Sequence, residues 1–392
     1  MRILIISDAW HPQVNGVVRT LESTVAQLRR MGHAVEVVGP EASRWCAVAA
    51  PSYPSIKLEF FARPRLRRLL ETFNPDFVHI ATEGPLGWAA RGVCLQRQKP
   101  FTTSYHTRFP EYLEARVPRG LRGLVFRLAY AVLRRFHAPS AAMFVATPSI
   151  ERELQQRKFR RIVRWSRGVD TDLFRPYGKE GTEFYSVPVD QPEQQGRSEK
   201  HSVPYPRPIL LYVGRVAVEK NLDAFLAADV VGTKVVIGDG PDLAALSHKY
   251  PAARFLGAME GEVLARHYAA ADLFIFPSTT DTFGLVLLEA AAAGLRIASY
   301  PAPGPADIFA DPATRSFAVL DADLGKAMRA ALALPDNPAV PRAYAERFSW
   351  EACTTQFYEH LQAPTPEAVR RITRFRNWLA RWWQRALALA FK

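Results

Sequence analysis

The feature of this sequence that most limits its possible folds is the alternation of short apolar runs with segments of helical periodicity. Apolar runs that end in turn residues are typical of buried strands, and strands that alternate with helices form parallel βαβ units. The pattern occurs in two series. The first predicts strands at 3–6, 35–38, 77–80, 101–105 and 143–147, with a helix at 18–30. The second predicts strands at 209–213, 234–237, 254–256, 273–276 and 296–300, with its clearest helix at 284–293.

The two series predict two α/β domains, because 392 residues are too many for one ordinary hydrophobic core. The stretch between them is rich in Gly, Pro, Glu, Gln and Ser and poor in aliphatic residues, so it is interpreted as a linker enlarged by a polar insertion. The expected organisation is an N-terminal domain at 1–175, the linker at 176–206, a C-terminal domain at 207–345, a crossover helix at 346–365 and a basic tail at 366–392.

The tail combines cationic and aromatic residues at helical spacing. An apolar face that carries tryptophans and is flanked by arginines is typical of a helix lying on a membrane surface. A helix packed across the two domains would also explain these apolar residues. The arginines are Arg370, Arg371, Arg374, Arg376, Arg381 and Arg385, and the tryptophans are Trp378, Trp382 and Trp383.

The charge balance indicates an anionic partner, since 51 Lys and Arg against 38 Asp and Glu give a formal net charge of +13. The aromatic residues form no recognisable nucleic-acid motif, so we expect no nucleic-acid partner. Three cysteines in an odd count suit neither a metal site nor a disulfide framework and indicate a reducing compartment. The apolar runs are too short for a signal peptide or a transmembrane helix. We therefore expect a cytoplasmic protein, soluble or bound to a membrane surface.

Two candidate ligand-binding positions follow strands of the first domain. The loop after the first strand leads through Asn15 and Gly16 into a helix, where main-chain N–H groups and the helix dipole can hold an anion. Gly16 would let a phosphate approach the main chain closely. His106 follows the strand at 101–105, at the carboxyl edge where open α/β sheets bind ligands. An ordinary strand-to-helix turn and a structural histidine are the alternatives.

Cations and glycines follow strands of the second domain. Arg215 and Lys220 come after the strand at 209–213, and two cations at this edge suit a diphosphate. In isolation, a solvated pair of charges is the simpler interpretation. The turn at 238–241 is not a complete dinucleotide fingerprint, because Leu243 occupies the third glycine position. A tight turn at Gly240 beside a nucleotide base remains an expectation.

The most informative segment is 276–294, where a buried strand is followed by a polar turn and then a helix. We expect the helix N-terminus around Phe283, Gly284 and Leu285 to bind phosphate through main-chain groups. Asp281 could bind sugar hydroxyls, and Glu289 could reach a ribose diol. A carboxylate within such an apolar helix would be costly without a partner, which favours a functional interpretation.

Two Asp-x-Asp sequences, at 170–172 and 321–323, lie in turn-like stretches with no third ligand in view. We therefore expect no metal and no other cofactor.

Taken in order, these motifs resemble those of the family-4 retaining glycosyltransferases of the GT-B fold over residues 1 to about 360. The matching elements are the glycine-bearing loop at 12–16, His106, Gly-Val-Asp-x-x-x-Phe at 168–174, Gly-Arg-x-x-x-x-Lys at 214–220, Gly-Asp-Gly-Pro at 238–241, and the acidic pair Asp281 and Glu289. The resemblance implies two Rossmann-like domains that face each other across a cleft, followed here by the amphipathic helical extension.

The resemblance also implies roles for individual residues. Arg215 and Lys220 would bind the donor diphosphate, Glu289 the ribose and Asp281 the transferred sugar, with His106 near that sugar. Asp281 stands where the family more usually has Glu. Thr-Asp-Thr-Phe-Gly at 280–284 is similar to a subgroup of sulfolipid-synthase-like and α-mannosyltransferase-like enzymes, many of which glycosylate lipids.

The expected function is transfer of a sugar from a UDP-sugar or GDP-mannose to a membrane lipid, such as diacylglycerol or a phospholipid, on the inner face of the cell membrane. The lipid is inferred from six arginines among apolar residues at 112–136 and six more in the tail. A GT-B sugar-nucleotide epimerase, or a glycosyltransferase for a soluble or polysaccharide acceptor, are the alternatives.

Overall fold

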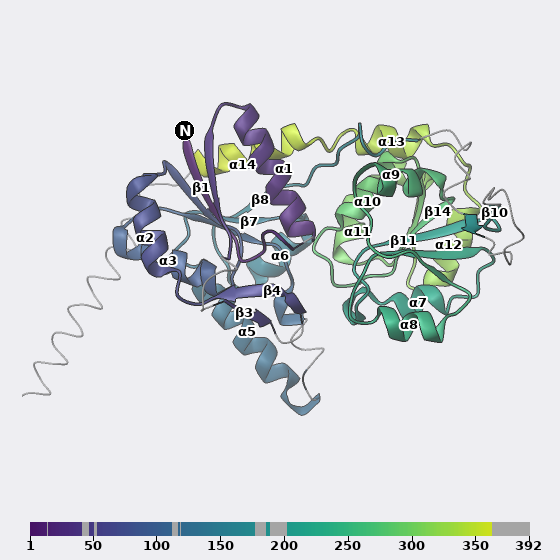
Figure 1. The fold of residues 1–392 in the computed structure, drawn as a ribbon, viewed down its shortest axis with the longest axis horizontal. Coiled ribbons are helices and arrows are strands. Elements are labelled where there is room, and N and C mark those ends of the chain that lie inside the picture. The colour runs from purple at the N-terminus through teal and green to yellow at the C-terminus, as the bar shows by residue number, and fades with distance from the viewer. Residues whose placement is uncertain are drawn as a thin grey trace, which may run out of the picture. The chain divides into compact units, whose positions relative to one another are not determined.

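The computed structural model describes residues 1–13, 15–40, 47–50, 53–111, 117, 119–176, 186–188 and 202–362. The predicted tail at 366–392, most of the predicted insertion, and Cys46 lie outside these residues. Contacts divide the chain into two compact units, one formed by Met1–Ser166 with the segment from Glu351, the other by Arg167–Trp350 (Figure 1).

The first unit contains a six-stranded parallel sheet in the order β2-β1-β5-β6-β7-β8. Ile3, Leu4, Ile5 and Ile6 of the central strand β1 are all buried, because helices cover both faces of the sheet. The strands are β1 (Arg2–Ile6), β2 (Ala34–Val38), β5 (Phe77–Ile80), β6 (Thr102–Tyr105), β7 (Met143–Val145) and β8 (Ile162–Arg164).

Helices of the first unit supply the rest of its core. One apolar cluster joins β1 and β5 to α2 and α3, and a second joins β6 and β7 to α5 and α6. The last helix among the described residues, α14, returns to this unit, where Gln356 Oε1 accepts a hydrogen bond of 2.7 Å from the Ser166 N–H. The helices are α1 (Gly16–Arg30), α2 (Arg63–Thr72), α3 (Pro85–Arg97), η1 (Arg119–Leu121), α5 (Arg122–His137), α6 (Pro148–Gln156) and α14 (Trp350–Gln362).

The second unit repeats this design with a parallel sheet in the order β13-β12-β11-β14-β15-β16. Leu210, Tyr212, Val236 and Ile275 of three adjacent strands pack in one apolar cluster with residues of α7 and α12. The strands are β11 (Ile209–Val213), β12 (Thr233–Ile237), β13 (Arg254–Phe255), β14 (Leu273–Phe276), β15 (Arg296–Ser299) and β16 (Ala318–Leu320).

The helices of the second unit connect these strands. They are η3 (Val218–Lys220), α7 (Leu222–Leu226), α8 (Leu243–Lys249), α9 (Gly261–Ala270), α10 (Leu285–Ala292), α11 (Pro303–Ile308), η4 (Pro312–Ser316), α12 (Leu324–Leu332) and α13 (Ala339–Ala345).

All ten predicted strands and the predicted helices at 18–30 and 284–293 are confirmed, with bounds that differ by at most two residues. The crossover helix predicted at 346–365 corresponds to α14, which begins at Trp350. The sequence pattern did not predict the edge strands β8 and β16, which have three residues each and are too short to show a periodicity. It also did not predict two antiparallel pairs, β3 (Ala47–Ala50) with β4 (Tyr53–Glu59), and β9 (Ser186–Pro188) with β10 (Ser202–Pro204).

Candidate active site

The second unit has a topological switch point between β11 and β14. The chain runs from β11 outward to β12 and β13, and then returns to place β14 on the other side of β11. Loops that leave two neighbouring parallel strands in opposite directions open a crevice at their carboxyl ends, where α/β proteins bind ligands. The loops at this crevice are 214–221 after β11 and 277–284 after β14, and they carry most of the residues predicted to bind the donor.

Direct contacts join these two loops. Lys220 Nζ lies 2.6 Å from Asp281 Oδ1, with the two side chains 21% and 18% exposed. Asn221 Nδ2 donates to the Pro277 carbonyl at 3.3 Å, and Thr280 Oγ1 donates to the Glu219 carbonyl at 3.2 Å. The predicted cation and the predicted sugar-binding carboxylate therefore form an ion pair across the switch point.

The second carboxylate oxygen of Asp281 stands out chemically. Oδ2 is buried and has no hydrogen-bond partner among the residues that the structure describes. An unsatisfied buried acceptor costs about 1–3 kcal/mol. A ligand hydroxyl that donates to Oδ2 would remove this cost, so Asp281 is suited to bind an alcohol group.

Arg215 lies at the same edge of the sheet and is more open to solvent. Its Nη1 is 3.8 Å from Glu219 Oε1, and its side chain is 36% exposed. Its carbonyl accepts a hydrogen bond of 2.8 Å from the buried Tyr212 hydroxyl, which fixes the main chain while the guanidinium reaches outward. This arrangement leaves the guanidinium accessible to an anion.

The glycines at 238 and 240 are required by the close approach of two loops. A Cβ added to Gly238 would lie 1.8 Å from the Gly214 carbonyl oxygen, and one added to Gly240 would lie 2.2 Å from that of Val216. A hydrogen bond of 2.9 Å from Val216 N to the Asp239 carbonyl holds the loops together. The Gly-Asp-Gly turn therefore packs directly against the segment that carries Arg215.

The N-terminus of α10 supplies main-chain donors beside Asp281. Gly284 caps the helix with φ +95°, and a Cβ there would come within 2.9 Å of the Phe276 ring. The first N–H groups of a helix lack a partner in a preceding turn and carry its positive dipole end. Here Leu287 N already donates to the Gly284 carbonyl at 3.0 Å, so the donors offered to a ligand are those of Leu285 and Val286. Phe283 is buried directly before this cap, so it positions the turn.

Glu289 is buried within α10, and Tyr268 is one of its hydrogen-bond partners. The Tyr268 hydroxyl of α9 donates to Glu289 Oε2 at 2.8 Å, and both residues are almost fully buried. Phe174 of the Gly-Val-Asp-x-x-x-Phe element packs against the Tyr268 ring, with centroids 5.4 Å apart. Tyr268 could not be predicted from the sequence, because a tyrosine within a helical pattern carries no signal of the residue that it will contact.

In the first unit, Asp8 occupies the corresponding switch point between β1 and β5. Its carboxylate accepts hydrogen bonds from the Leu86 and Gly87 N–H groups at 2.8 and 3.1 Å and from the Thr82 hydroxyl at 2.8 Å. Burial raises the pKa of Asp8, although these hydrogen bonds act in the opposite direction. Asp8 therefore caps α3, a role that the sequence analysis did not assign.

The predicted anion site at the start of α1 is partly occupied by the protein itself. Asn15 Oδ1 accepts hydrogen bonds from Val17 N and Val18 N at 3.0 and 3.1 Å. These two donors of the first turn are therefore engaged, and the exposed Gly16 is the position that an anion could approach. Its role in donor binding stays a prediction.

His106 directly follows β6, as predicted, and is 8% exposed. Its ring packs edge-on against the fully buried Trp165, with centroids 5.8 Å apart. The structure thus places His106 and Gly16 in the first unit, while Arg215, Lys220, Gly240, Asp281, Phe283, Gly284, Leu285 and Glu289 all lie in the second.

Both Asp-x-Asp sequences form turns. Asp170 Oδ1 accepts hydrogen bonds from Asp172 N and Leu173 N at 3.1 and 2.9 Å, and Asp323 caps α12 through the Lys326 N–H at 3.0 Å. Within the described part of the chain, no group of three or more His, Cys, Asp and Glu residues could hold a metal ion.

Comparisons with known proteins agree with this geometry. Residues 14–173 match the family model described as Glycosyltransferase Family 4, and residues 207–334 match that described as Glycosyl transferases group 1. A GDP-mannose-dependent alpha-mannosyltransferase of Mycolicibacterium smegmatis is 30% identical over 82% of this chain and 85% of its own length. The chain belongs to the family-4 glycosyltransferases. It is therefore a transferase enzyme.

Further similarities support this assignment. A sulfoquinovosyl transferase of Arabidopsis thaliana is 28% identical over 78% of this chain and 60% of its own length. An alpha-monoglucosyldiacylglycerol synthase of Streptococcus pneumoniae is 26% identical over 86% of this chain and 79% of its own length. The structure of a sucrose-phosphate synthase from Thermosynechococcus elongatus matches with a TM-score of 0.67 at 20% identity, covering 93% of this chain and all of that one. The GT-B fold and the predicted subgroup are thereby confirmed.

Proposed function

We propose that this glycosyltransferase moves a hexose from a UDP-sugar or GDP-mannose to a membrane lipid, with retention of the anomeric configuration. The observation that carries the proposal is the pairing of Lys220 with Asp281, which leaves the buried Asp281 Oδ2 ready to accept a hydrogen bond. This pair suits a ligand that contains both a phosphate and a sugar. The cation can bind the phosphate, and the unsatisfied carboxylate oxygen can accept a hydrogen bond from a sugar hydroxyl.

Each part of a nucleotide sugar has a matching group in the second unit. The diphosphate would lie against Arg215, Lys220 and the N-terminus of α10, where two cations and a helix dipole attract negative charge. The ribose would reach Glu289, which Tyr268 holds in place. The base would lie near the Gly-Asp-Gly turn, where the closeness of the main chain leaves little room for side chains.

These same groups would promote the reaction. As the nucleoside diphosphate departs, negative charge develops on its phosphate oxygens, and prearranged cations and N–H groups stabilise that charge. We propose that this stabilisation comes from Arg215, Lys220 and α10 without a metal ion. The acceptor hydroxyl would attack from the same face, giving up its proton to the departing phosphate, with His106 near the transferred sugar.

The proposed acceptor is a lipid such as diacylglycerol or a phospholipid. The Streptococcus pneumoniae relative is named an alpha-monoglucosyldiacylglycerol synthase, and its similarity covers most of this chain. The positive net charge of +13 fits an anionic membrane surface. We propose that the enzyme acts as a peripheral protein on the cytoplasmic face of the membrane. Among the described residues, no helix is long and apolar enough to cross a membrane.

The donor can be identified by thermal unfolding in the presence of UDP- and GDP-sugars. A ligand at 100 times its Kd stabilises the folded protein by about 2.7 kcal/mol. For the second unit, which runs from Arg167 to Trp350, a stabilisation of this magnitude raises the Tm by about 5–10 °C. We expect one donor class to produce this rise in the wild type and not in Lys220→Ala. If no nucleotide sugar shifts the Tm, the proposed donor class is wrong.

Turnover of site variants tests the roles of the acidic pair. We expect Asp281→Ala and Glu289→Ala to lower kcat by about 100-fold or more while the protein stays folded. The matched control is Lys249→Ala. It removes the ion pair between Lys249 and Asp223, which has the same 2.6 Å length as the pair between Lys220 and Asp281 but lies on the surface of the second unit. Near-normal activity in both acidic-site variants would refute the assignment.

Product analysis tests the acceptor. We expect donor turnover to require a lipid acceptor and the product to be an α-glycoside. Conversion of the donor in the absence of any acceptor would instead indicate a sugar-nucleotide epimerase. The tail at 366–392 is tested separately: equal binding of the full chain and a truncation after Ala363 to anionic vesicles would rule out the tail as the membrane anchor.

A further inference from the structure

Helix α5 is apolar on two opposite faces, and within the described part of the chain only one of them is covered. Tyr130 and Leu133 are buried against α6 and β7 in the core of the first unit. On the opposite side, four aliphatic residues at helical spacing run along η1 and α5 and form what we call the α5 strip. They are Leu121, Leu124, Leu128 and Val132, which are 54%, 68%, 62% and 44% exposed.

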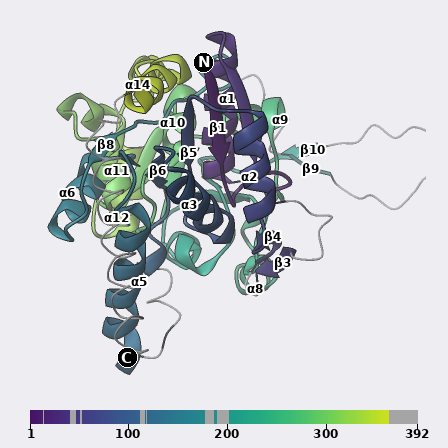
Figure 2. The ribbon, with the colours of Figure 1, turned by 90° about the vertical axis from the view of Figure 1, so that its left-hand side faces the viewer.

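The spacing shows that these residues share one face. Positions three and four residues apart on a helix lie above one another, so 121, 124, 128 and 132 line a single stripe. Figure 2 shows α5 extending beyond the rest of the first unit. Single exposed aliphatic residues are normal on protein surfaces, but a contiguous apolar stripe marks a binding surface.

The charge around the α5 strip indicates what it binds. From 115 to 150 the sequence contains no Asp or Glu. The same stretch contains Arg116, Arg119, Arg122, Arg127, Arg134 and Arg135. The Asp, Glu, Lys and Arg residues within η1 and α5 are therefore all arginines, and an apolar stripe on such a helix is typical of a helix that lies in the interface of an anionic membrane.

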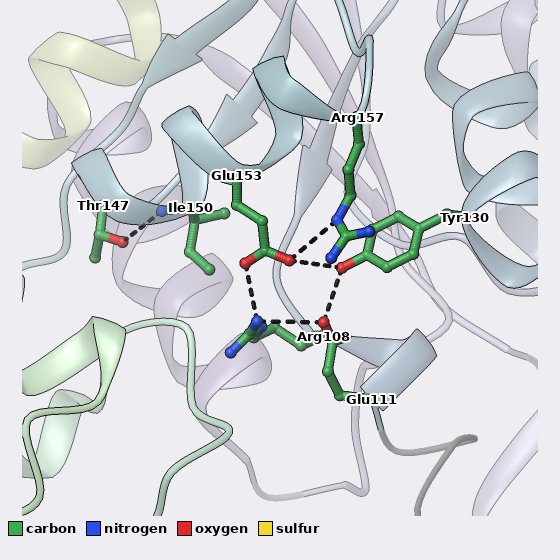
Figure 3. A network of polar contacts seen from close by, with 7 residues as sticks. All are labelled: Arg108, Glu111, Tyr130, Thr147, Ile150, Glu153 and Arg157. Atoms are coloured by element: carbon green, nitrogen blue, oxygen red, sulfur yellow. Dashed lines mark hydrogen bonds and ion pairs between the residues drawn. The ribbon is translucent and has the colours of Figure 1, made fainter. Parts of the chain in front are cut away.

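The helix is held so that this strip faces outward. The Tyr130 hydroxyl lies 2.8 Å from Glu111 Oε1 and 2.9 Å from Glu153 Oε1, and the Arg157 guanidinium lies over the Tyr130 ring at 4.0 Å (Figure 3). Arg108 joins the same two glutamates at 3.2 and 2.9 Å. These contacts all lie on the covered side of α5, so they fix its rotation.

Arg91 of α3 anchors the end of the helix in the same way. It donates to the Phe136 and Arg135 carbonyls, each at 3.0 Å.

We propose that the α5 strip docks on an anionic lipid surface, with its leucines in the acyl boundary and its arginines at the headgroups. Two other occupants are disfavoured by charge. A second copy of α5 would bring arginines against arginines, and the tail at 366–392 carries six arginines of its own. The inference extends the proposed transfer to a lipid, but docking is measured without any turnover.

The test uses the full chain and sedimentation with vesicles of phosphatidylcholine alone or with 30% phosphatidylglycerol. We expect Leu124→Ser/Leu128→Ser to weaken binding to the anionic vesicles at least about tenfold, since burying one leucine contributes about that factor. Arg127→Ala/Arg134→Ala should weaken it about fivefold per arginine, and only on anionic vesicles. The matched control Val231→Ser/Val263→Ser removes residues 85% and 53% exposed in the second unit and should change binding less than twofold.

Three results would overturn the proposal. The leucine variant could bind anionic vesicles as well as the wild type does. The wild type could be a dimer that this variant converts to a monomer, which would identify a second copy as the occupant. The leucine and control variants could lose binding equally. Transfer to a lipid acceptor dissolved in detergent separates the docking hypothesis from the proposed function. If only the docking hypothesis is wrong, the wild type still transfers sugar to the dissolved lipid. If the proposed acceptor class is wrong, the wild type shows no such transfer.

Discussion

The hydrogen bond between Tyr268 and Glu289 allows a quantitative test of how the donor site is supported. Tyr268→Phe removes one hydroxyl and keeps the ring that packs against Phe174. Glu289 is 6% exposed, so water cannot readily replace the lost donor. A hydrogen bond to a charged group contributes about 1.5–3 kcal/mol when its partner stays buried. The second unit spans 184 residues (167 to 350), for which each kcal/mol lowers the Tm by about 2–4 °C.

We therefore expect Tyr268→Phe to lower the Tm of the second unit by about 3–12 °C in thermal unfolding without ligand. Tyr250→Phe is a matched control, because the Tyr250 hydroxyl donates to Asp223 Oδ1 at the same 2.8 Å on the surface of the same unit. Its cost should stay below about 0.5 kcal/mol. Equal Tm values for Tyr268→Phe and wild type, or equal losses in both variants, would refute the argument from burial.

Three further predictions address other parts of the molecule. Tyr268→Phe should also raise the KM for the nucleotide-sugar donor by a larger factor than it lowers kcat. An unchanged KM would show that Glu289 does not contribute to donor binding. Gly238→Ala should abolish donor-induced thermal stabilisation, because its Cβ would lie 1.8 Å from the Gly214 carbonyl, whereas Gly123→Ala, with nothing within 4 Å, should leave it unchanged. Burial raises the pKa of Cys94 from 9.0 to about 12, so the stability that the protonated thiol contributes is complete below pH 9 and is lost as the pH rises toward 12. Peptide mass spectrometry after iodoacetamide treatment at pH 8 should accordingly find Cys94 unmodified in the folded protein and alkylated in urea.

Much of the donor site could be predicted from sequence because its residues follow buried strands directly. Arg215 comes two residues after β11, and the turn at 238–240 follows β12 immediately. In a parallel sheet all such positions meet at one edge, so local sequence predicts proximity. Asp281 and Lys220 were both selected in this way, but their ion pair depends on β14 returning beside β11, which no local pattern specifies.

Other contributions were invisible at the level of sequence. Tyr268 lies 21 residues from Glu289, and Asp8 lies 78 residues from the Leu86 N–H that it caps. The anion site expected at Gly16 has fewer available donors than the sequence suggests. The Asn15 side chain already accepts hydrogen bonds from two N–H groups of the first helical turn. Competition between a side chain and a ligand for the same N–H groups is decided by side-chain geometry.

The sequence by itself determined the two parallel α/β sheets and the positions of the candidate residues along the chain, because hydrophobic periodicity and turn residues act over a few positions. Only the tertiary structure decided which of these residues touch. It paired Lys220 with Asp281, gave Glu289 the hydroxyl of Tyr268, and turned Leu124 and Leu128 of α5 away from the core. The physical reason is that such contacts join segments far apart in the chain, and strand order and helix rotation are fixed only when the whole core packs.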